Sequence, residues 1–310
     1  MEKTKRFKIR KNEIEHQTMV WLGILFVAIF CYVPMFGIIL AFKDESARQI
    51  DVMKIIFEAD FVGFENFELF LADSESKNVI WNTLGLNSLM MLINFPSPIL
   101  FAILISELKK PTFKRTVQTI SYLPHFLSWV VFGGMVLTLI NTDTGALNDF
   151  LLRLGLIKKP LEIAGDPDAF WGLIIITSLI KGVGWGSIIY LAAISGVSRD
   201  LYEAAEIDGA NRFQRILHVT LPGIAPSIVT FLLLSTSGIL NSSVEHILVF
   251  QNPDNISKSQ VIDTMVLQYG IQKGNYQYAT AIGVFKSVIS CFLLIGSNFI
   301  SKKLTGKGLY

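Results

Sequence analysis

Long apolar segments alternate with short polar ones along the whole chain. Each apolar segment has about the 20 residues that a helix needs to cross the hydrocarbon core of a bilayer. The pattern therefore predicts an all-α membrane protein with six transmembrane helices. These segments lie at about residues 19–42, 81–108, 120–140, 170–197, 222–240 and 278–300.

The first apolar segment follows a basic stretch, so a cleaved secretory signal is a competing interpretation. The segment is longer than the apolar region of most signals, and no small-x-small cleavage site follows it. We therefore expect a retained first span, with residues 1–18 as a cytoplasmic segment and residues 19–310 as one six-span domain. Between the first two spans, phenylalanine recurs at every third position from Phe61 to Phe70 among acidic residues. This spacing predicts an amphipathic element on the membrane interface or capping the outer face.

Several spans contain residues that interrupt a helix. The second span holds Asn94, Pro96 and Pro98, and the third holds Pro124. Breaks at membrane depth are tolerated only inside a helix bundle or against a cavity.

The fourth span is unusually polar at its middle, from Lys181 to Ser187. A lysine in hydrocarbon costs about 2.5–3.5 kcal/mol on insertion scales, so it needs a partner, water or access to the interface. The fifth span runs into a second polar stretch that includes Asn241. We expect the two stretches to line a ligand path formed by Lys181, Gly182, Trp185, Asn241, Ser242 and Glu245.

Purely structural interpretations of the same residues remain open. Gly182 and Gly186 form a GxxxG pair that would let helices pack closely. Lys181 could pair with Glu245 or reach the interface, and Asn241 could merely bind helices together.

A polar island of about thirty residues, 198–226, separates the fourth and fifth spans. Ser198 is placed to cap a short helix over 199–208, which Gly209 ends. Asn211 and Gln214 then have the spacing of a capping box, which predicts a second short helix ending near Val219.

Composition supports a location in a bilayer. Hydrophobic residues make up 51% of the 310 residues and the mean hydropathy is +0.50, which is too apolar for a soluble domain. The formal net charge of +2 indicates no nucleic-acid partner. The two Cys and four His residues are scattered and predict neither a disulfide nor a metal site.

The distribution of Lys and Arg predicts the orientation. With both termini in the cytoplasm, 16 of the 27 Lys and Arg residues lie in cytoplasmic segments and nine in the longer outer ones. Positive charge gathers on the cytoplasmic side, so the polar island is expected there too. No GxxxxGK[ST] loop, GxSxG elbow or HExxH pair is present, so neither nucleotide hydrolysis nor a common hydrolase site is predicted.

Residues of the polar island have the spacing of a known sequence motif. Glu203, Ala204 and Ala205 are followed after three residues by Gly209, and after nine more by the run 219–222, Val-Thr-Leu-Pro. This resembles the EAA signature of the membrane subunits of ATP-binding cassette (ABC) importers, although the family usually has Ile at the position of the valine. The resemblance implies a coupling helix that docks into an ATPase through Glu203, Ala204, Ala205, Asp208 and Gly209.

Several short sequence motifs extend the resemblance over nearly the whole chain. They are residues 32–37, 61–67, 122–124 and 201–205, and they look like the oligosaccharide permeases of Gram-positive bacteria. The resemblance implies the type I importer fold in a bacterial plasma membrane, with a homologous second permease, two ATPase subunits, an extracellular solute-binding protein and a carbohydrate substrate. It also implies that ATP and Mg are bound by the ATPase and that this chain binds no cofactor. A membrane enzyme and an ATP-independent channel or receptor are the alternatives.

Overall fold

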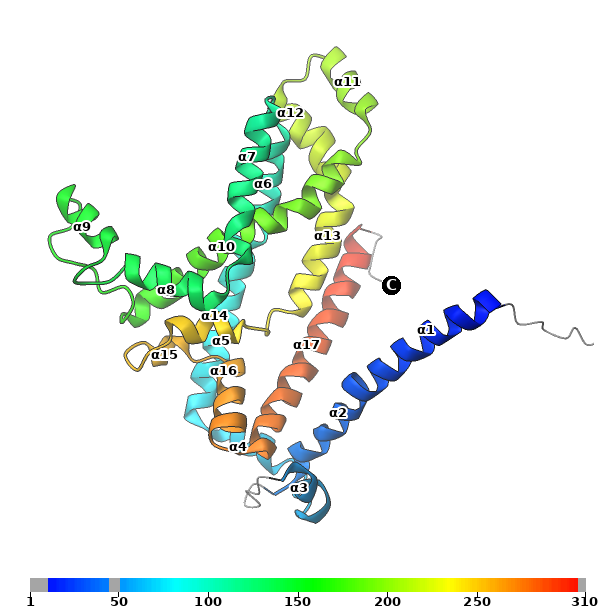
Figure 1. Cartoon of the computed structure of the whole chain (residues 1–310), viewed down its shortest axis with the longest axis vertical. Helices are drawn as coiled ribbons and strands as arrows, with labels where there is room; N and C mark the ends of the chain where they lie inside the picture. The colour runs from blue at the N-terminus through cyan, green and yellow to red at the C-terminus, as the bar shows by residue number, and fades with distance from the viewer. Residues whose placement is uncertain (1–10, 45–50, 306–310) are drawn as a thin grey trace, which may run out of the picture.

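The computed structural model describes residues 11–44 and 51–305, and within these ranges helices make up most of the chain (Figure 1). Five helical stretches are long and apolar enough to cross a membrane, and a sixth qualifies if two strongly bent halves are counted as one span. The five are His16–Phe42, Ser74–Ser106, Pro167–Ser195, Arg212–Ser237 and Tyr276–Lys303. Five of the six predicted spans are thus confirmed as continuous apolar stretches, with altered ends.

The first stretch packs against α17 (Tyr276–Thr305) through its last part, and its earlier part extends away from the other helices (Figure 1). It consists of α1 (Lys11–Val27), the π-helical turn η1 (Ala28–Tyr32), α2 (Val33–Met35) and the 3-10 helix η2 (Phe36–Phe42). Most of its side chains are exposed, as expected for contact with lipid or another subunit. Five of the basic residues predicted to flank it lie outside the described residues, as does Lys307 at the other end.

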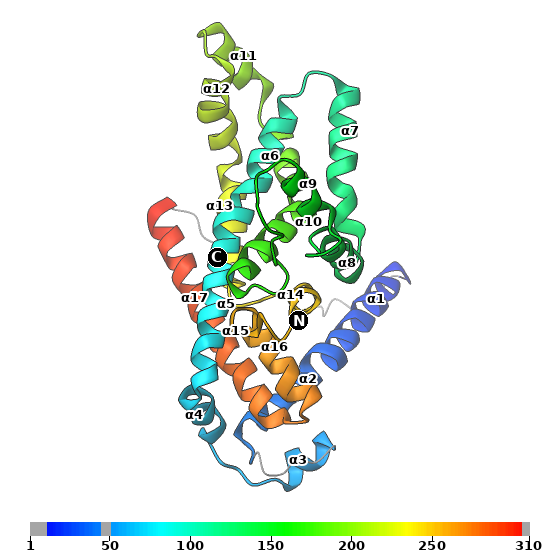
Figure 2. The same ribbon diagram turned by 90° about the vertical axis from the view of Figure 1, so that its left-hand side faces the viewer.

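The phenylalanine-rich segment caps the end of the bundle opposite the polar island (Figure 2). It follows α3 (Val52–Glu58) and leads into α4 (Glu65–Ala72), and Asn66 anchors it by donating to the carbonyls of Ala41 and Lys43. Phe70, at 1% exposure, packs edge-on against Tyr278 and another ring of α17 (Tyr276–Thr305). The structure places this segment at one end of the bundle, and its position relative to the membrane stays a prediction.

The second and third spans differ in how they tolerate proline. Helices α5 (Ser74–Asn94) and α6 (Pro96–Ser106) continue one another because Pro96 and Pro98 lie in the first turn of α6, where a missing N–H is harmless. The predicted third span is present as two halves that meet at a sharp bend, not as one continuous helix. Helix α7 (Pro111–Tyr122) and the 3-10 turn η3 (Leu123–Phe126) stop at an extended Leu127, and α8 (Trp129–Leu139) starts at a 103° angle.

Helix α10 (Pro167–Ser195) runs through the middle of the bundle. It follows the short peripheral helix α9 (Ala146–Arg153). Asp166 caps its start, and its buried face packs against α5, α6, α7 and α13 (Leu221–Ser237). Phe170 and Ile174 belong to the main apolar cluster together with Leu86 and Phe250. Helix α10 therefore supplies the side chains around which the other elements assemble.

The polar island forms the helical corner that its sequence predicts. Ser198 caps α11 (Arg199–Ile207), Gly209 has φ of +79°, and the Asn211–Gln214 capping box is present before α12 (Arg212–Arg215). The prediction that this second helix ends near Val219 is wrong. It passes through the π turn η4 (Ile216–Thr220) into α13, because the wider turn accommodates the ring of Pro222 without stopping the helix.

The last part of the chain returns through several short helices. They are α14 (Val244–Phe250), α15 (Ile256–Ser259), α16 (Ile262–Leu267) and the π turn η5 (Gln268–Gln272), and they lead into α17. A linker of residues 238–243 separates α13 from α14, and it carries two of the predicted path residues, Asn241 and Ser242.

Candidate functional site

Lys181 lies on α10 at the point where α7 and α8 meet. It is 7% exposed, and its Nζ donates to the carbonyls of Pro124 at 3.2 Å, His125 at 2.9 Å and Leu127. These carbonyls are available because the helix breaks there. The partner that a membrane lysine needs is therefore the backbone of the bend rather than Glu245, which is exposed on the first turn of α14.

Trp185, one turn after Lys181, forms an aromatic wall with the bend. Its ring stacks on His125 at 4.5 Å between centroids with an interplanar angle of 1°, and Phe126 contacts it edge-on at 5.6 Å. Trp185 is still 45% exposed. A partly open indole is suited to stacking on the apolar face of a sugar ring.

Some glycines of α10 lie directly against a neighbouring helix, whereas others have free space beside them. A Cβ on Gly184 would lie 2.1 Å from the carbonyl oxygen of Ser121, and one on Gly186 would lie 3.1 Å from Pro98. A Cβ on Gly182 would meet nothing within 4 Å. Close packing therefore uses Gly184 and Gly186, whereas Gly182 of the predicted GxxxG pair faces open space.

His246 of α14 is a buried packing residue, which is one of the roles expected for the scattered histidines. It is 1% exposed and stacks on Trp129 at 3.6 Å. Thr177 Oγ1 lies 2.7 Å from the Leu173 carbonyl and 2.9 Å from His246 Nε2. The threonine hydroxyl and the ring nitrogen are within hydrogen-bond distance, and the tautomer of the ring decides which of them donates. This contact joins α14 to α10 directly behind Lys181.

A cavity of about 380 Å³ lies between α5, α6, α10 and the linker after α13. Its wall combines apolar side chains with Asn87, Asn94, Ser235 and Asn241. Neither side-chain atom of the Asn94 amide has a hydrogen-bond partner within the described part of the chain. Buried amides are normally satisfied, so this one is available to water or to a ligand hydroxyl. The volume falls within the usual range for small-molecule sites.

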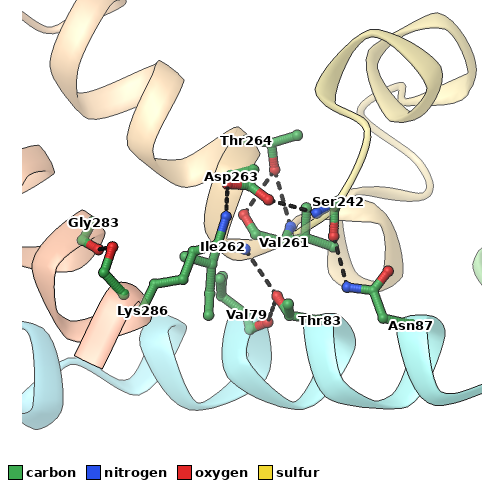
Figure 3. A network of polar contacts seen from close by, with 11 residues as sticks. Val79, Thr83, Asn87, Ser242, Val261, Ile262, Asp263, Thr264, Gly283 and Lys286 are labelled. Atoms are coloured by element: carbon green, nitrogen blue, oxygen red, sulfur yellow. Dashed lines mark hydrogen bonds and ion pairs between the residues drawn. The ribbon is translucent and has the colours of Figure 1, made fainter. Parts of the chain in front are cut away.

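The cavity includes residues that the sequence did not single out as ligand contacts. Asn241 was predicted, whereas Asn87, Asn94 and Ser235 were not. The polar break at Asn94 was the one available signal, because an asparagine at membrane depth needs a partner. Ser242 points away into a different network, in which its hydroxyl accepts from Asn87 Nδ2 at 2.9 Å and its amide donates to Asp263 at 2.7 Å (Figure 3).

The predicted coupling residues project at one end of the molecule, on α11 and the corner after it (Figures 1 and 2). Glu203, Ala204, Asp208 and Gly209 are exposed, and Ala205 is half-buried. Ala205, Asp208 and Gly209 line a hollow of about 330 Å³ between α11 and the following turns.

Two contacts hold this corner against the long helix that follows. Glu206 pairs with Arg215 at 3.2 Å, and the Tyr202 hydroxyl lies 3.0 Å from Thr220 Oγ1. Around the corner, Ile207 is 87% and Phe213 71% exposed. An apolar surface on a fixed projecting corner is typical of a docking element.

Known proteins are similar to this chain over most of its length. The family model described as "Binding-protein-dependent transport system inner membrane component" matches residues 69–306. Protein LplB of Bacillus subtilis is 38% identical over 93% of this chain and 88% of LplB. The polygalacturonan/rhamnogalacturonan transport system permease protein YteP of the same organism is 34% identical over 100% of this chain and 94% of YteP.

Solved structures are similar over nearly the same length. A bacterial ABC transporter involved in the import of the acidic polysaccharide alginate has a chain with a TM-score of 0.86 and 34% identity, and the match covers 95% of this chain and 97% of that one. The alginate transporter in complex with an alginate pentasaccharide-bound periplasmic protein matches at a TM-score of 0.86 and 33% identity, covering 96% and 98%.

Proposed function

The chain belongs to the family of binding-protein-dependent transport system inner membrane components, and we propose that it is one of two homologous membrane subunits of an ATP-driven importer for an oligosaccharide. As a multi-pass permease subunit it forms half of the translocation path. An extracellular solute-binding protein delivers the sugar, and two copies of a separate ATPase subunit supply the energy.

The substrate class is supported by what similar proteins carry. YteP is named for polygalacturonan and rhamnogalacturonan transport, and the two similar structures are of alginate transporters. The polar and aromatic groups around α10 fit a sugar, because hydroxyls pair with amides and ring faces stack on indole.

The observation that carries the coupling role is the EAA pattern folded as a separate helix at one end of the molecule. Glu203, Ala204, Ala205, Asp208 and Gly209 lie on α11 or its corner, where a partner can reach them. ATP and Mg are bound by the partner ATPase, this chain binds no cofactor, and no nucleic acid takes part.

The sugar path runs past α10 and the linker after α13. Gly182 leaves room, Trp185 offers an indole face, and Asn241 contributes an amide to the cavity that also contains Asn94. Lys181 supports this wall through the carbonyls of the bend, Glu245 lies at the end of the path, and Ser242 holds the linker there through Asn87 and Asp263.

The orientation follows from the distribution of Lys and Arg. Both termini and α11 lie in the cytoplasm of a bacterial cell, and the loop containing α9 and the segment containing α4 lie outside. This arrangement places the coupling corner on the side where ATP is.

Copurification and transport test the proposal together. A tagged copy of this chain is expected to copurify with a second permease and an ATPase. The complex, placed in liposomes with its binding protein, is expected to take up oligosaccharides from a panel prepared from alginate, polygalacturonan and rhamnogalacturonan. A chain that purifies without an ATPase would contradict the importer proposal and favour a channel, receptor or membrane enzyme.

A further inference from the structure

Lys286 is the second lysine within a predicted span, and the proposed sugar path does not use it. It lies on α17 and forms an ion pair with Asp263 of α16, and their side chains are 13% and 17% exposed (Figure 3). The two side chains are each other's charged partner at a place where both are largely removed from water. An ionised carboxylate is a stronger hydrogen-bond acceptor than a neutral group.

The other carboxylate oxygen of Asp263 binds the linker between α13 and α14. It accepts from the backbone amide of Ser242 at 2.7 Å, while the Ser242 hydroxyl accepts from Asn87 Nδ2 at 2.9 Å. Ser242 lies beyond the end of α13, so a helical hydrogen bond does not satisfy its amide. Asp263 thus holds the linker from one side and Asn87 of α5 from the other (Figure 3).

Asp263 is itself fixed with respect to α5. The adjacent Ile262 amide donates to Thr83 Oγ1 at 2.9 Å, and Thr83 in turn donates to the Val79 carbonyl. The start of α16 is closed by Val261 and Thr264, whose backbone and side chain bond to each other. The carboxylate therefore reaches the linker from a rigid base.

We propose that Asp263, oriented by Lys286, is the positioning residue that sets the conformation of the linker 238–243 and so places Asn241 in the sugar path. This role rests on the proposed function for its consequence, but its geometry can be tested separately. The linker otherwise has turn contacts, such as the Asn241 amide donating to the Gly238 carbonyl at 2.8 Å. Few alternative acceptors exist at membrane depth, so losing the carboxylate releases the linker.

The test measures how fast a cysteine at a buried position of the linker becomes accessible to a thiol reagent. Leu240, at 2% exposure, is replaced by cysteine in a Cys31→Ser, Cys291→Ser background, and the purified complex is treated with N-ethylmaleimide. Asp263→Leu with Lys286→Met removes the acceptor without leaving a buried charge, and it is expected to speed labelling about tenfold or more. Asp263→Asn with Lys286→Met keeps an acceptor oxygen and is expected to stay within about threefold of the parent.

A matched control replaces an exposed ion pair, Asp149 and Arg153 of α9, by Asn and Met, and labelling is expected to be unchanged. If the Leu and Met variant fails to assemble, Asp263→Ala with Lys286→Met takes its place with the same expected rate. Equal labelling rates for the parent and the acceptor-free variant would overturn the proposal. Fast labelling of the variant with Asp263→Asn and Lys286→Met would overturn it too.

Labelling also separates this role from the proposed function. With a sugar that the parent complex takes up, the acceptor-free variant is expected to need about tenfold more sugar-loaded binding protein for half-maximal uptake. A complex that transports no sugar but still shows the labelling difference would contradict the proposed function and leave the positioning role standing.

Discussion

At the residue scale, Lys181 shows how a lysine that is unfavourable in a bilayer can stabilise the fold. Its ammonium satisfies three carbonyls that the broken helix leaves open. Lys181→Met is expected to leave those carbonyls buried, at about 1–3 kcal/mol for each unsatisfied group, and to lower the midpoint of thermal unfolding of the complex. The exposed Lys303→Met is the control, and its midpoint should not move. A stable Lys181→Met complex that had lost only sugar affinity would instead make Lys181 a ligand contact.

The aromatic wall yields a second prediction at this scale. Trp185→Ala and Asn241→Ala are each expected to raise the concentration for half-maximal uptake by about tenfold, since stacking and amide contacts contribute on the order of 1 kcal/mol each. Trp81→Ala removes an indole of α5 that is 66% exposed and is not one of the rings stacked at the bend, so it serves as the control. Normal uptake by both path variants, in a correctly assembled complex, would remove these residues from the path.

At the element scale, α11 is the proposed docking surface, and its shape is expected to matter more than its charge. Ala205 lines the hollow beside Gly209, so Ala205→Leu would fill the space that a partner enters. We expect the permease to remain in the membrane while the ATPase no longer copurifies with it. Ala146→Leu adds the same bulk to an exposed position of α9 and should not affect copurification. Retention of the ATPase by Ala205→Leu would argue against α11 as the docking element.

The extent to which the elements follow from the sequence depends on the range of the contacts that fix them. The capping box of Asn211 and the corner at Gly209 are local, so their spacing predicts them correctly. The 103° bend between α7 and α8 is not local. Pro124 is compatible with a continuing helix, and the bend is held by Lys181, which comes more than fifty residues later.

The candidate site shows the same limit. Polar residues in α10 and the linker predict a path because their cost in a bilayer is visible in the sequence. Which of them face a cavity depends on packing between distant helices, as with Asn94 against the linker or Asp263 against Ser242. The cost of a polar residue identifies the region, and tertiary contacts decide the role of each side chain.

At the scale of the whole molecule, α11 and the segment containing α4 lie at opposite ends (Figure 2). The proposed orientation places α11 and Arg115 in the cytoplasm. Single cysteines near Arg115 and Glu203, in a background without Cys31 and Cys291, should react with an impermeant maleimide only after the cells are opened. A cysteine on α9 should react in intact cells. Labelling of the Glu203 site from outside would reverse the orientation and remove the coupling role.

The most direct test of the central claim is sugar-stimulated ATP hydrolysis by the purified complex with and without Gly209→Val. Gly209 has φ of +79°, and a branched side chain there costs more than about 1 kcal/mol, so the corner and α11 must move. Gly196, which is not in the left-handed region, provides the control as Gly196→Ala. The account predicts that the sugar-loaded binding protein stimulates the parent and the control, whereas Gly209→Val remains at its basal rate. Full stimulation of Gly209→Val would contradict the claim that α11 couples ATP hydrolysis to transport.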